Sequence, residues 1–277
     1  AYTPDVAASL VGEFEELTGR KASAADRARI RDDFVGDELM FREAIARHER
    51  EVGAIARQRP APTFENTVVA LDAAGLDLSR VNLVFNGLSG AETTPALQAL
   101  GREVAPLLSA HRDDILLDPA LFARVRTVWE GRAKRKLDPD QATLLERTYK
   151  DFVRGGAQLD AAGKQRLRAS NAELATLSVR FRDHLLHDTN DWRLRLTARE
   201  QLAGLPDRVV AGAADAAEKA GAKGEWHVTL QAPSLWPFLQ YARDRELRRQ
   251  AFTAYIARGA HGDAPDNRAV LARIAAL

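Results

Sequence analysis

The chain has no cysteine among its 277 residues. This absence excludes a disulfide framework and thiolate metal sites, and it fits a reducing compartment, so we expect a cytoplasmic location. Long hydrophobic runs are also missing, because no stretch reaches the roughly 18 apolar residues that a membrane helix needs. The first residues lack a basic segment followed by an apolar one, so neither an export signal nor a membrane partner is expected.

An excess of charge of one sign is absent as well. The 40 Lys and Arg residues nearly balance the 39 Asp and Glu residues, for a formal net charge of +1. The densest basic cluster is interleaved with Asp244 and Glu246 and consists of Arg243, Arg245, Arg248 and Arg249. We interpret it as a solvated, internally paired surface, and we expect no nucleic-acid partner.

Several catalytic and nucleotide-binding motifs are missing. The chain has no phosphate loop of the G-x-x-x-x-G-K-[ST] type, no G-x-G-x-x-G after a strand and no serine nucleophile elbow. Internal repeats and low-complexity segments are absent too. These absences leave no support for nucleotide-binding, serine-hydrolase and repeat-array proteins.

Helical periodicity dominates the sequence that is present. Residues 144–190 predict two helices separated by Gly155-Gly156, and the second begins at about Asp160. One face of this second helix carries Leu167, Asn171, Leu174, Leu177, Phe181 and Leu185, which we call its apolar seam. A helix of about 28 residues rises roughly 42 Å, so it should act as a spine for shorter neighbours. The simplest interpretation is one elongated, mainly α multi-helix domain.

Capping residues and prolines divide the rest of the chain into helices. Predicted helices cover 5–19, begin at Ser23 and span Asp37 to about Arg59. Further predicted starts are Thr63, Leu76, Thr94-Pro95, Asp118-Pro119 and Asp138-Pro139, and Pro106 should kink or divide its helix.

Two short segments break the helical pattern. Residues 192–197 and 226–231 alternate apolar and polar side chains, which predicts a small two-stranded β element. Thr197 and Glu200 suggest a capping box between them, Pro206 begins another helix, and two more helices follow Ser234. The final residues start a helix without a stop signal, so we expect the chain to be a truncated piece.

One cluster has the spacing of a metal site. His184 and His187 lie three residues apart on the spine, followed by Asp188 and Asp191, and side chains at that spacing can share an ion. No third ligand is fixed by spacing, and Leu185 continues the apolar seam. We therefore favour a structural role and assign no metal-binding, catalytic or cofactor-binding residue.

The remaining candidates also favour structural roles. His111 is interpreted as a helix-end histidine near C-terminal carbonyls. The adjacent pairs Asp113/Asp114 and Asp32/Asp33 point to different sides of a helix and should not share a proton. The four Trp residues, including the one in the PSLWPF turn, could form a ligand shelf, although anchors of the small sheet are the favoured interpretation.

The order of several phrases resembles the N-terminal half of the thimet oligopeptidase family of zinc metallopeptidases, closest to its peptidyl-dipeptidase and oligopeptidase A branch. The resemblance runs from about Phe41 to the last residue. It is carried by PTFENTVVALDAAGLDLSRVNLVFNGLSG, APLLSAHRDDILLDPALFARV, LLERTYKDFVRGGAQLDAAGKQRLRASNAELATLSVRF, LAGLPDRVV and TLQAPSLWPFLQYARDRELRRQAF. Residues 1–40 diverge, because they lack the family's Pro- and Phe-rich opening segment. His184 stands where related members have Asn.

The resemblance implies a neurolysin-like helical region, 41–277, that forms the wall and rim of a narrow channel for short peptides. The family's zinc site is an H-E-x-x-H helix with a downstream Glu, and this motif is absent here. None of the six histidines has the spacing, and they are His48, His111, His184, His187, His227 and His261. Zinc is therefore expected in the intact enzyme and not in this chain.

The predicted function is the channel-wall region of a zinc-dependent oligopeptidase or peptidyl-dipeptidase, inactive by itself, with the missing catalytic half as its partner. Apolar surface that would face that half could also drive self-association. Three alternatives remain: a stand-alone helical peptide-binding or regulatory module, one half of a split peptidase, and an engineered or rearranged chain.

Overall fold

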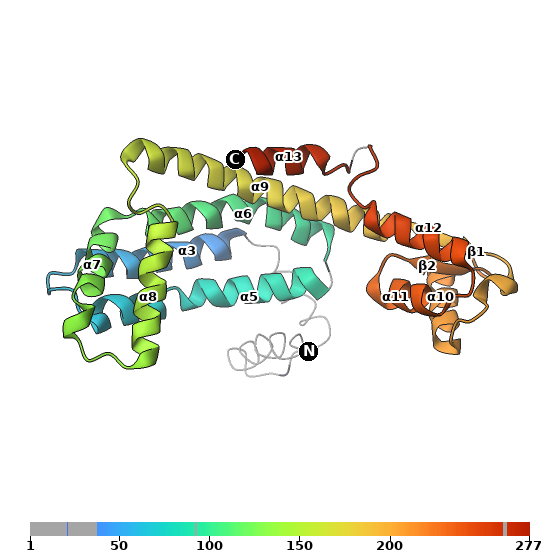
Figure 1. Ribbon diagram of the computed structural model, residues 1–277, viewed down its shortest axis with the longest axis horizontal. Coiled ribbons are helices and arrows are strands. Elements are labelled where there is room, and N and C mark those ends of the chain that lie inside the picture. The colour runs from blue at the N-terminus through green and yellow to red at the C-terminus, as the bar shows by residue number, and fades with distance from the viewer. Residues whose placement is uncertain (1–20, 22–37, 92, 263–264) are drawn as a thin grey trace. The chain divides into compact units, whose positions relative to one another are not determined.

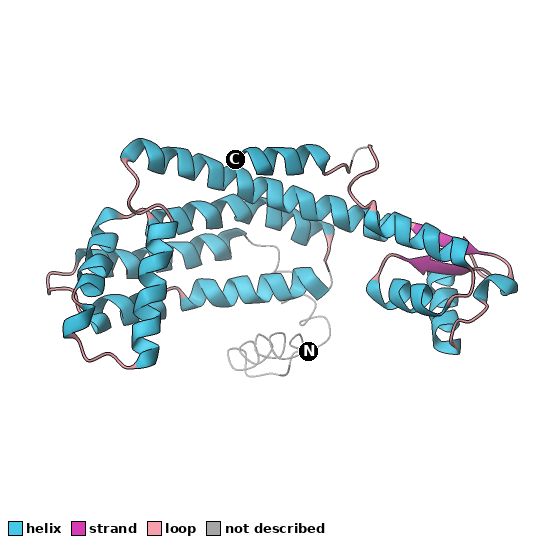
Figure 2. Ribbon diagram, in the orientation of Figure 1, coloured by secondary structure: helices cyan, strands magenta, loops and turns pink. Residues whose placement is uncertain are grey.

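A computed structural model describes residue 21 and residues 38–277 except 92 and 263–264. The described part is mainly helical with one small antiparallel sheet, as predicted (Figure 1, Figure 2). The predicted helices over 5–19 and from Ser23, and the pair Asp32/Asp33, lie outside the described residues. The chain forms two compact units, Ala1–Thr176 and Leu177–Leu277. The boundary falls inside the single region 41–277 that the resemblance implied.

The first unit is built from helices whose starts follow local capping chemistry. Thr63 accepts a hydrogen bond from the Asn66 N–H, and Asp118 and Asp138 cap the helices that begin at the following prolines. Pro106 lies inside one continuous helix, so the predicted division does not occur. The elements are α3 (Glu38–Arg57), η1 (Phe64–Val69), α4 (Ala70–Ala73), α5 (Leu76–Ala91), α6 (Pro95–Leu116), α7 (Pro119–Glu130), η2 (Arg132–Lys134), α8 (Pro139–Arg154) and the first half of α9 (Ala161–Asp191).

Three buried clusters form the core of this unit. One joins α3, α7 and α8 through Val52, Leu121 and Phe152. A second joins α3, α5 and α6, and a third lies under η1, where Phe64 and Val68 pack with Val128 and Leu145. Helix α9 begins after Gly156, whose φ of +92° suits a glycine. The predicted spine is therefore confirmed in length, although its predicted apolar seam is only half-buried.

The second unit packs helices around the sheet. Strand β1 (Arg193–Leu196) pairs antiparallel with β2 (Trp226–Thr229), and Leu194 lies opposite Val228. Leu196, Val228, Leu235 and Phe238 are at most 1% exposed and form the centre of the core. The other elements are η3 (Arg199–Leu202), α10 (Asp207–Lys219), α11 (Ala232–Tyr241), α12 (Arg245–Ile256) and α13 (Arg268–Ala276).

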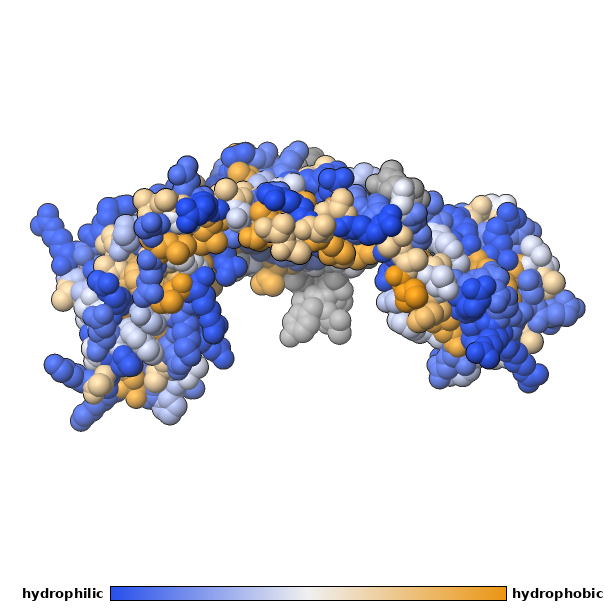
Figure 3. Space-filling view, turned by 45° about the horizontal axis from the view of Figure 1, so that its top comes forward, coloured by the Kyte–Doolittle hydropathy of each residue, from blue (hydrophilic) through white to orange (hydrophobic). Residues whose placement is uncertain are grey.

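Two local predictions in this unit are wrong. The N-cap residue of η3 is Ala198. The Gln201 side chain accepts hydrogen bonds from the backbone N–H groups of Thr197 and Ala198. A glutamine in the first turn thus replaces the expected Thr197–Glu200 pair. The PSLWPF segment lies in α11 and not in a turn, since Pro237 falls within a continuing helix. On the face shown in Figure 3, hydrophobic residues are interspersed among hydrophilic ones on both units.

Candidate functional site

The metal-like group on α9 does not converge on one point. His184 Nδ1 lies 2.9 Å from Asn267 Oδ1, while His187 is exposed and its Nδ1 is 3.6 Å from Asp188. Asp188 is buried at 7% exposure. Over the described residues, no group of three or more His, Cys, Asp or Glu side chains could hold a metal ion. The side chains that are present therefore do not fit a zinc centre.

Asp188 instead fastens the turn that follows α12. Its carboxylate accepts the Gly259 N–H at 2.5 Å and lies 3.2 Å from His261 Nε2. The neighbouring Thr189 hydroxyl accepts a hydrogen bond from Arg258 at 2.8 Å. Because the Asp188 carboxylate is buried, the Gly259 N–H and the His261 imidazole supply polar partners that water cannot.

Asn267 completes the same junction. Its amide donates to the Phe181 carbonyl at 3.1 Å while its oxygen faces His184. Gly259 has a φ of +68°, and a Cβ there would lie 2.7 Å from the Asn267 side chain. A glycine is therefore required for this close approach. We did not predict Asn267 or His261 as site residues, because their partners lie on α9, far away in sequence.

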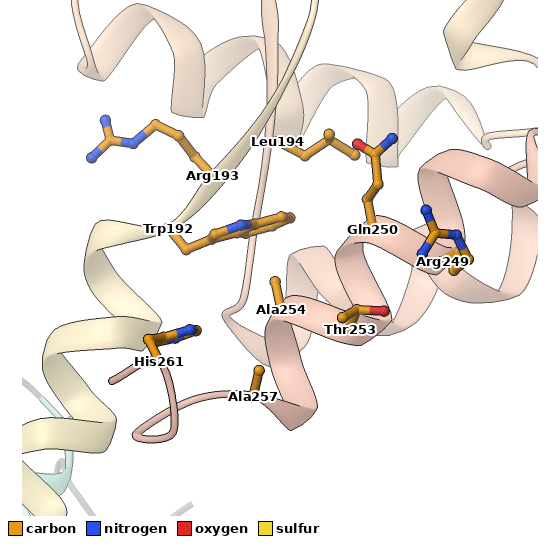
Figure 4. A pocket seen from close by; sticks show the side chains of 9 residues that line it. All are labelled: Trp192, Arg193, Leu194, Arg249, Gln250, Thr253, Ala254, Ala257 and His261. Carbon is orange, nitrogen blue, oxygen red and sulfur yellow. The ribbon is translucent and has the colours of Figure 1, made fainter. Parts of the chain in front are cut away.

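A shallow hollow of about 490 Å³ opens beside this junction (Figure 4). We call it the Trp192 hollow, and its lining consists of Trp192, Arg193, Leu194, Arg249, Gln250, Thr253, Ala254, Ala257 and His261. Trp192 directly follows α9, Arg193 and Leu194 begin β1, and the others belong to α12 or to the turn after it. Trp192 also packs against the core of this unit, as the anchor interpretation predicted. The lining combines an indole, two guanidinium groups, an imidazole, an amide and a hydroxyl, which suits the binding of a ligand.

The other tryptophans do not form one shelf. Trp226 packs against the same core as Trp192, whereas Trp236 is 48% exposed and contacts Tyr255 edge-on. Trp129 lies in the first unit, where it stacks on Tyr149 at 4.8 Å between ring centroids. The anchor interpretation therefore holds for the two tryptophans that begin the strands.

His111 does not lie among helix-end carbonyls, so that prediction is wrong. It is 4% exposed, and its Nε2 lies 2.9 Å from His48 Nδ1 on α3. Burial lowers the pKa of both imidazoles, and the neighbouring His111 lowers the pKa of His48 further. The pair therefore joins α3 to α6 in the neutral form.

The described acidic pair has the predicted arrangement, and two arginines of the basic cluster have partners within the chain. Asp113 is buried and accepts a hydrogen bond from Asn171 at 2.7 Å, while Asp114 pairs with Arg168 at the surface. The two carboxylates thus point to different sides of α6 and have separate partners. In the basic cluster, Arg249 pairs with Glu246, and Arg248 donates to the carbonyls of Ala242 and Arg243.

The described helices include none that combines the length and the apolar character of a membrane span. No protein-family profile matches the chain. Individual relatives do match. Dipeptidyl carboxypeptidase from Salmonella typhimurium is 37% identical over 234 residues, which covers 84% of this chain and 34% of that protein.

Two oligopeptidases match over a similar share. Oligopeptidase A from Escherichia coli is 26% identical over 230 residues, 82% of this chain and 34% of that protein. Probable cytosolic oligopeptidase A from Arabidopsis thaliana is 28% identical over 222 residues, 78% of this chain and 32% of that protein. The chain thus spans about a third of the length of the curated relatives it matches.

Proposed function

Because most of this chain is homologous to about one third of dipeptidyl carboxypeptidase and oligopeptidase A, in the thimet oligopeptidase family, we propose that it is the helical channel-wall region of such a peptidase. The intact enzyme would hydrolyse short peptides with a zinc-activated water. The observation that carries the proposal is the 37% identity over 234 residues to a dipeptidyl carboxypeptidase.

In this proposal the catalytic zinc is held by the part of the enzyme that this chain does not match. Two observations support it: the 277 residues contain no H-E-x-x-H motif, and the histidines of α9 bind Asn267 and Asp188 instead of converging. The chain contributes rigid helices that would restrict access to extended peptides. A cytoplasmic location belongs to the same proposal, supported by the cytosolic oligopeptidase among the relatives.

The first test is an assay of the purified chain with zinc on short internally quenched peptides. We expect no turnover that a chelator abolishes, because a hydrolytic zinc site needs three protein ligands and an activated water. Chelator-sensitive cleavage by the chain alone would contradict the proposed division of roles.

The second test is a chimera in which this chain replaces the matched third of the Salmonella typhimurium dipeptidyl carboxypeptidase. We expect the folded chimera to hydrolyse peptides, whereas the same enzyme with that third deleted should not. A folded, zinc-loaded chimera without activity would favour the stand-alone binding module over the channel wall.

A further inference from the structure

The Trp192 hollow has one apolar side and one charged edge. In Figure 4 the indole of Trp192 faces α12, where Ala254 and Ala257 present only methyl groups. Small side chains opposite a large aromatic surface leave room for an apolar group from a ligand. Burying such a group against an indole is favourable, because apolar surface is removed from water.

Among the described residues, one cation at the edge has no compensating anion. Arg249 is held by Glu246 through two hydrogen bonds of 2.5 and 2.8 Å, and His261 is held by the buried Asp188. Arg193 is exposed and extends away from the indole in Figure 4, and it makes no ion pair with the part of the chain that the structure describes. Its guanidinium is therefore available for a carboxylate beside the apolar group.

Neutral polar groups on α12 also line the hollow. Gln250 and Thr253 place an amide and a hydroxyl on the lining, where they could hydrogen bond to a peptide backbone. Asp188 fixes the imidazole of His261 at one end of the hollow, and the Gly259 N–H fixes Asp188 in turn. His261 is thus held in place without a ligand, which reduces the entropy that this side chain loses on binding.

We propose that the Trp192 hollow binds a peptide segment in which an acidic residue neighbours a large apolar residue, with the apolar side chain on Trp192 and the carboxylate on Arg193. This inference rests on the proposed function, because that function supplies the peptide as the ligand class. It adds a site and a side-chain preference that belong to this chain's own residues.

The test is titration calorimetry with three blocked peptides, acetyl-Gly-Phe-Glu-Gly-amide, its Gln analogue and its Ala-Glu analogue. Blocked ends leave the glutamate as the sole charge. We expect the Phe-Glu peptide to bind about three- to five-fold more tightly than the Phe-Gln peptide, as a partly exposed ion pair allows. The preference should shrink as salt is added, because salt screens exposed charges.

Two variants separate the charged edge from the apolar side. Arg193→Gln should abolish the preference for glutamate without weakening binding of the Phe-Gln peptide. Ala257→Leu should fill the hollow and weaken both Phe peptides by about ten-fold, since roughly one buried side chain is displaced. The controls are Arg208→Gln and Ala211→Leu at exposed positions of α10, and both should bind like the parent chain.

The outcomes distinguish the hollow from the broader function. Equal affinity for the Glu and Gln peptides, or unchanged binding by folded Arg193→Gln and Ala257→Leu variants, would contradict peptide binding by the Trp192 hollow. An active chimera would still support the channel-wall function in that case. An inactive, folded chimera with the predicted peptide preference would overturn the channel-wall function and keep the hollow. Absence of binding by all three peptides would overturn the hollow.

Discussion

At the scale of single residues, a neutral histidine pair connects two helices of the first unit. His111 Nδ1 is buried without a hydrogen-bond partner among the described residues, and the nearest carboxylate oxygen belongs to Glu49, 3.9 Å away and largely exposed. The ring of His48 also covers Gly75, whose N–H donates to Glu51. Protonation of His111 would place a charge where burial disfavours it.

This pair predicts acid sensitivity. The ordinary histidine pKa is 6.5, and the pKa values of both histidines are lower in the folded chain. As the pH falls below 6.5, the unfolded chain therefore binds protons before the folded chain does. The free energy of unfolding then decreases until the pH has fallen through the folded pKa. We expect His111→Gln to reduce the loss of unfolding free energy between pH 7.5 and 5, measured by urea denaturation followed by circular dichroism.

The matched control is His187→Gln, because His187 is 62% exposed on its side chain. It should keep the acid dependence of the parent chain. An identical pH dependence in His111→Gln and the parent would show that the buried pair does not cause the sensitivity.

Two glycines give opposite predictions for the same substitution. Gly75 has a φ of +74°, and a Cβ there would lie 2.6 Å from the His48 ring, whereas a Cβ at Gly87 inside α5 meets no described residue within 4 Å. We expect Gly75→Ala to destabilise the first unit by about 2 kcal/mol or more, through backbone strain and overpacking. Gly87→Ala should stabilise it by about 0.5–1 kcal/mol, because alanine is the better helix former.

Thermal and urea unfolding of the two variants would test this pair. Equal effects of both substitutions would mean that the Gly75 backbone relaxes at little cost. The comparison needs no functional assay, since neither glycine lines the Trp192 hollow.

At the scale of elements, a buried arginine joins α7 to the proline-containing segment between α3 and η1. Arg124 is 7% exposed and donates to the carbonyls of Gln58 and Pro60 and to Asn66 Oδ1, at 3.0 to 3.2 Å. Asn66 also takes part in the capping box that starts η1. One guanidinium group thus donates hydrogen bonds to two backbone carbonyls and one side-chain oxygen of this segment.

Replacing this arginine should loosen that segment. We expect Arg124→Met to destabilise the first unit by about 3 kcal/mol, because two carbonyls and an amide oxygen lose their charged donor. The control Arg126→Met removes a neighbouring arginine whose pairing with Glu130 is exposed, and it should change stability by less than about 0.5 kcal/mol. A similar small effect of both substitutions, by urea unfolding, would contradict the proposed role of Arg124.

The small sheet has a charged junction of its own. Arg195 on β1 makes two hydrogen bonds to Glu225, which also lies 3.2 Å from His227 Nε2 on β2. The hydrogen bond from Arg195, followed by that from His227, lowers the pKa of Glu225 to about 2. This carboxylate therefore keeps its charge between pH 7.5 and 5, the range of the test on the His48–His111 pair.

At the scale of the whole molecule, the chain contains two units with separate buried cores. Leu121 belongs to the first and Phe238 to the second, and both side chains are fully buried at 0% exposure. Separate cores allow one unit to open while the other remains folded.

Core substitutions should therefore act locally. We expect Leu121→Ala and Phe238→Ala each to cost about 3–5 kcal/mol, with loss of amide-exchange protection confined to the unit that carries the substitution. Hydrogen exchange read by mass spectrometry measures protection in each unit separately. Loss of protection across both units in either variant would show that they unfold together.

The sequence predicted the elements well and the candidate site poorly. Helix starts at Thr94, Asp118 and Asp138 follow from side chains that cap a backbone N–H two or three residues away, as observed. The strand pair followed from alternation around Trp192 and Trp226. Such capping residues can be predicted from the sequence because their hydrogen-bond partners lie only two or three residues away.

The contacts of the histidines were decided by tertiary structure. His111 meets His48 across 63 residues and His184 meets Asn267 across 83, and Asp188 holds Gly259 across 71. Spacing along one helix suggested an ion between His184 and His187, yet packing supplied each with a different neighbour. The sequence by itself determined the helices, the small sheet and the missing zinc motif, because these depend on local patterns. Only the tertiary structure decided the two units, the neutral histidine pair and the Trp192 hollow, because burial and long-range contacts choose the partner of each polar group.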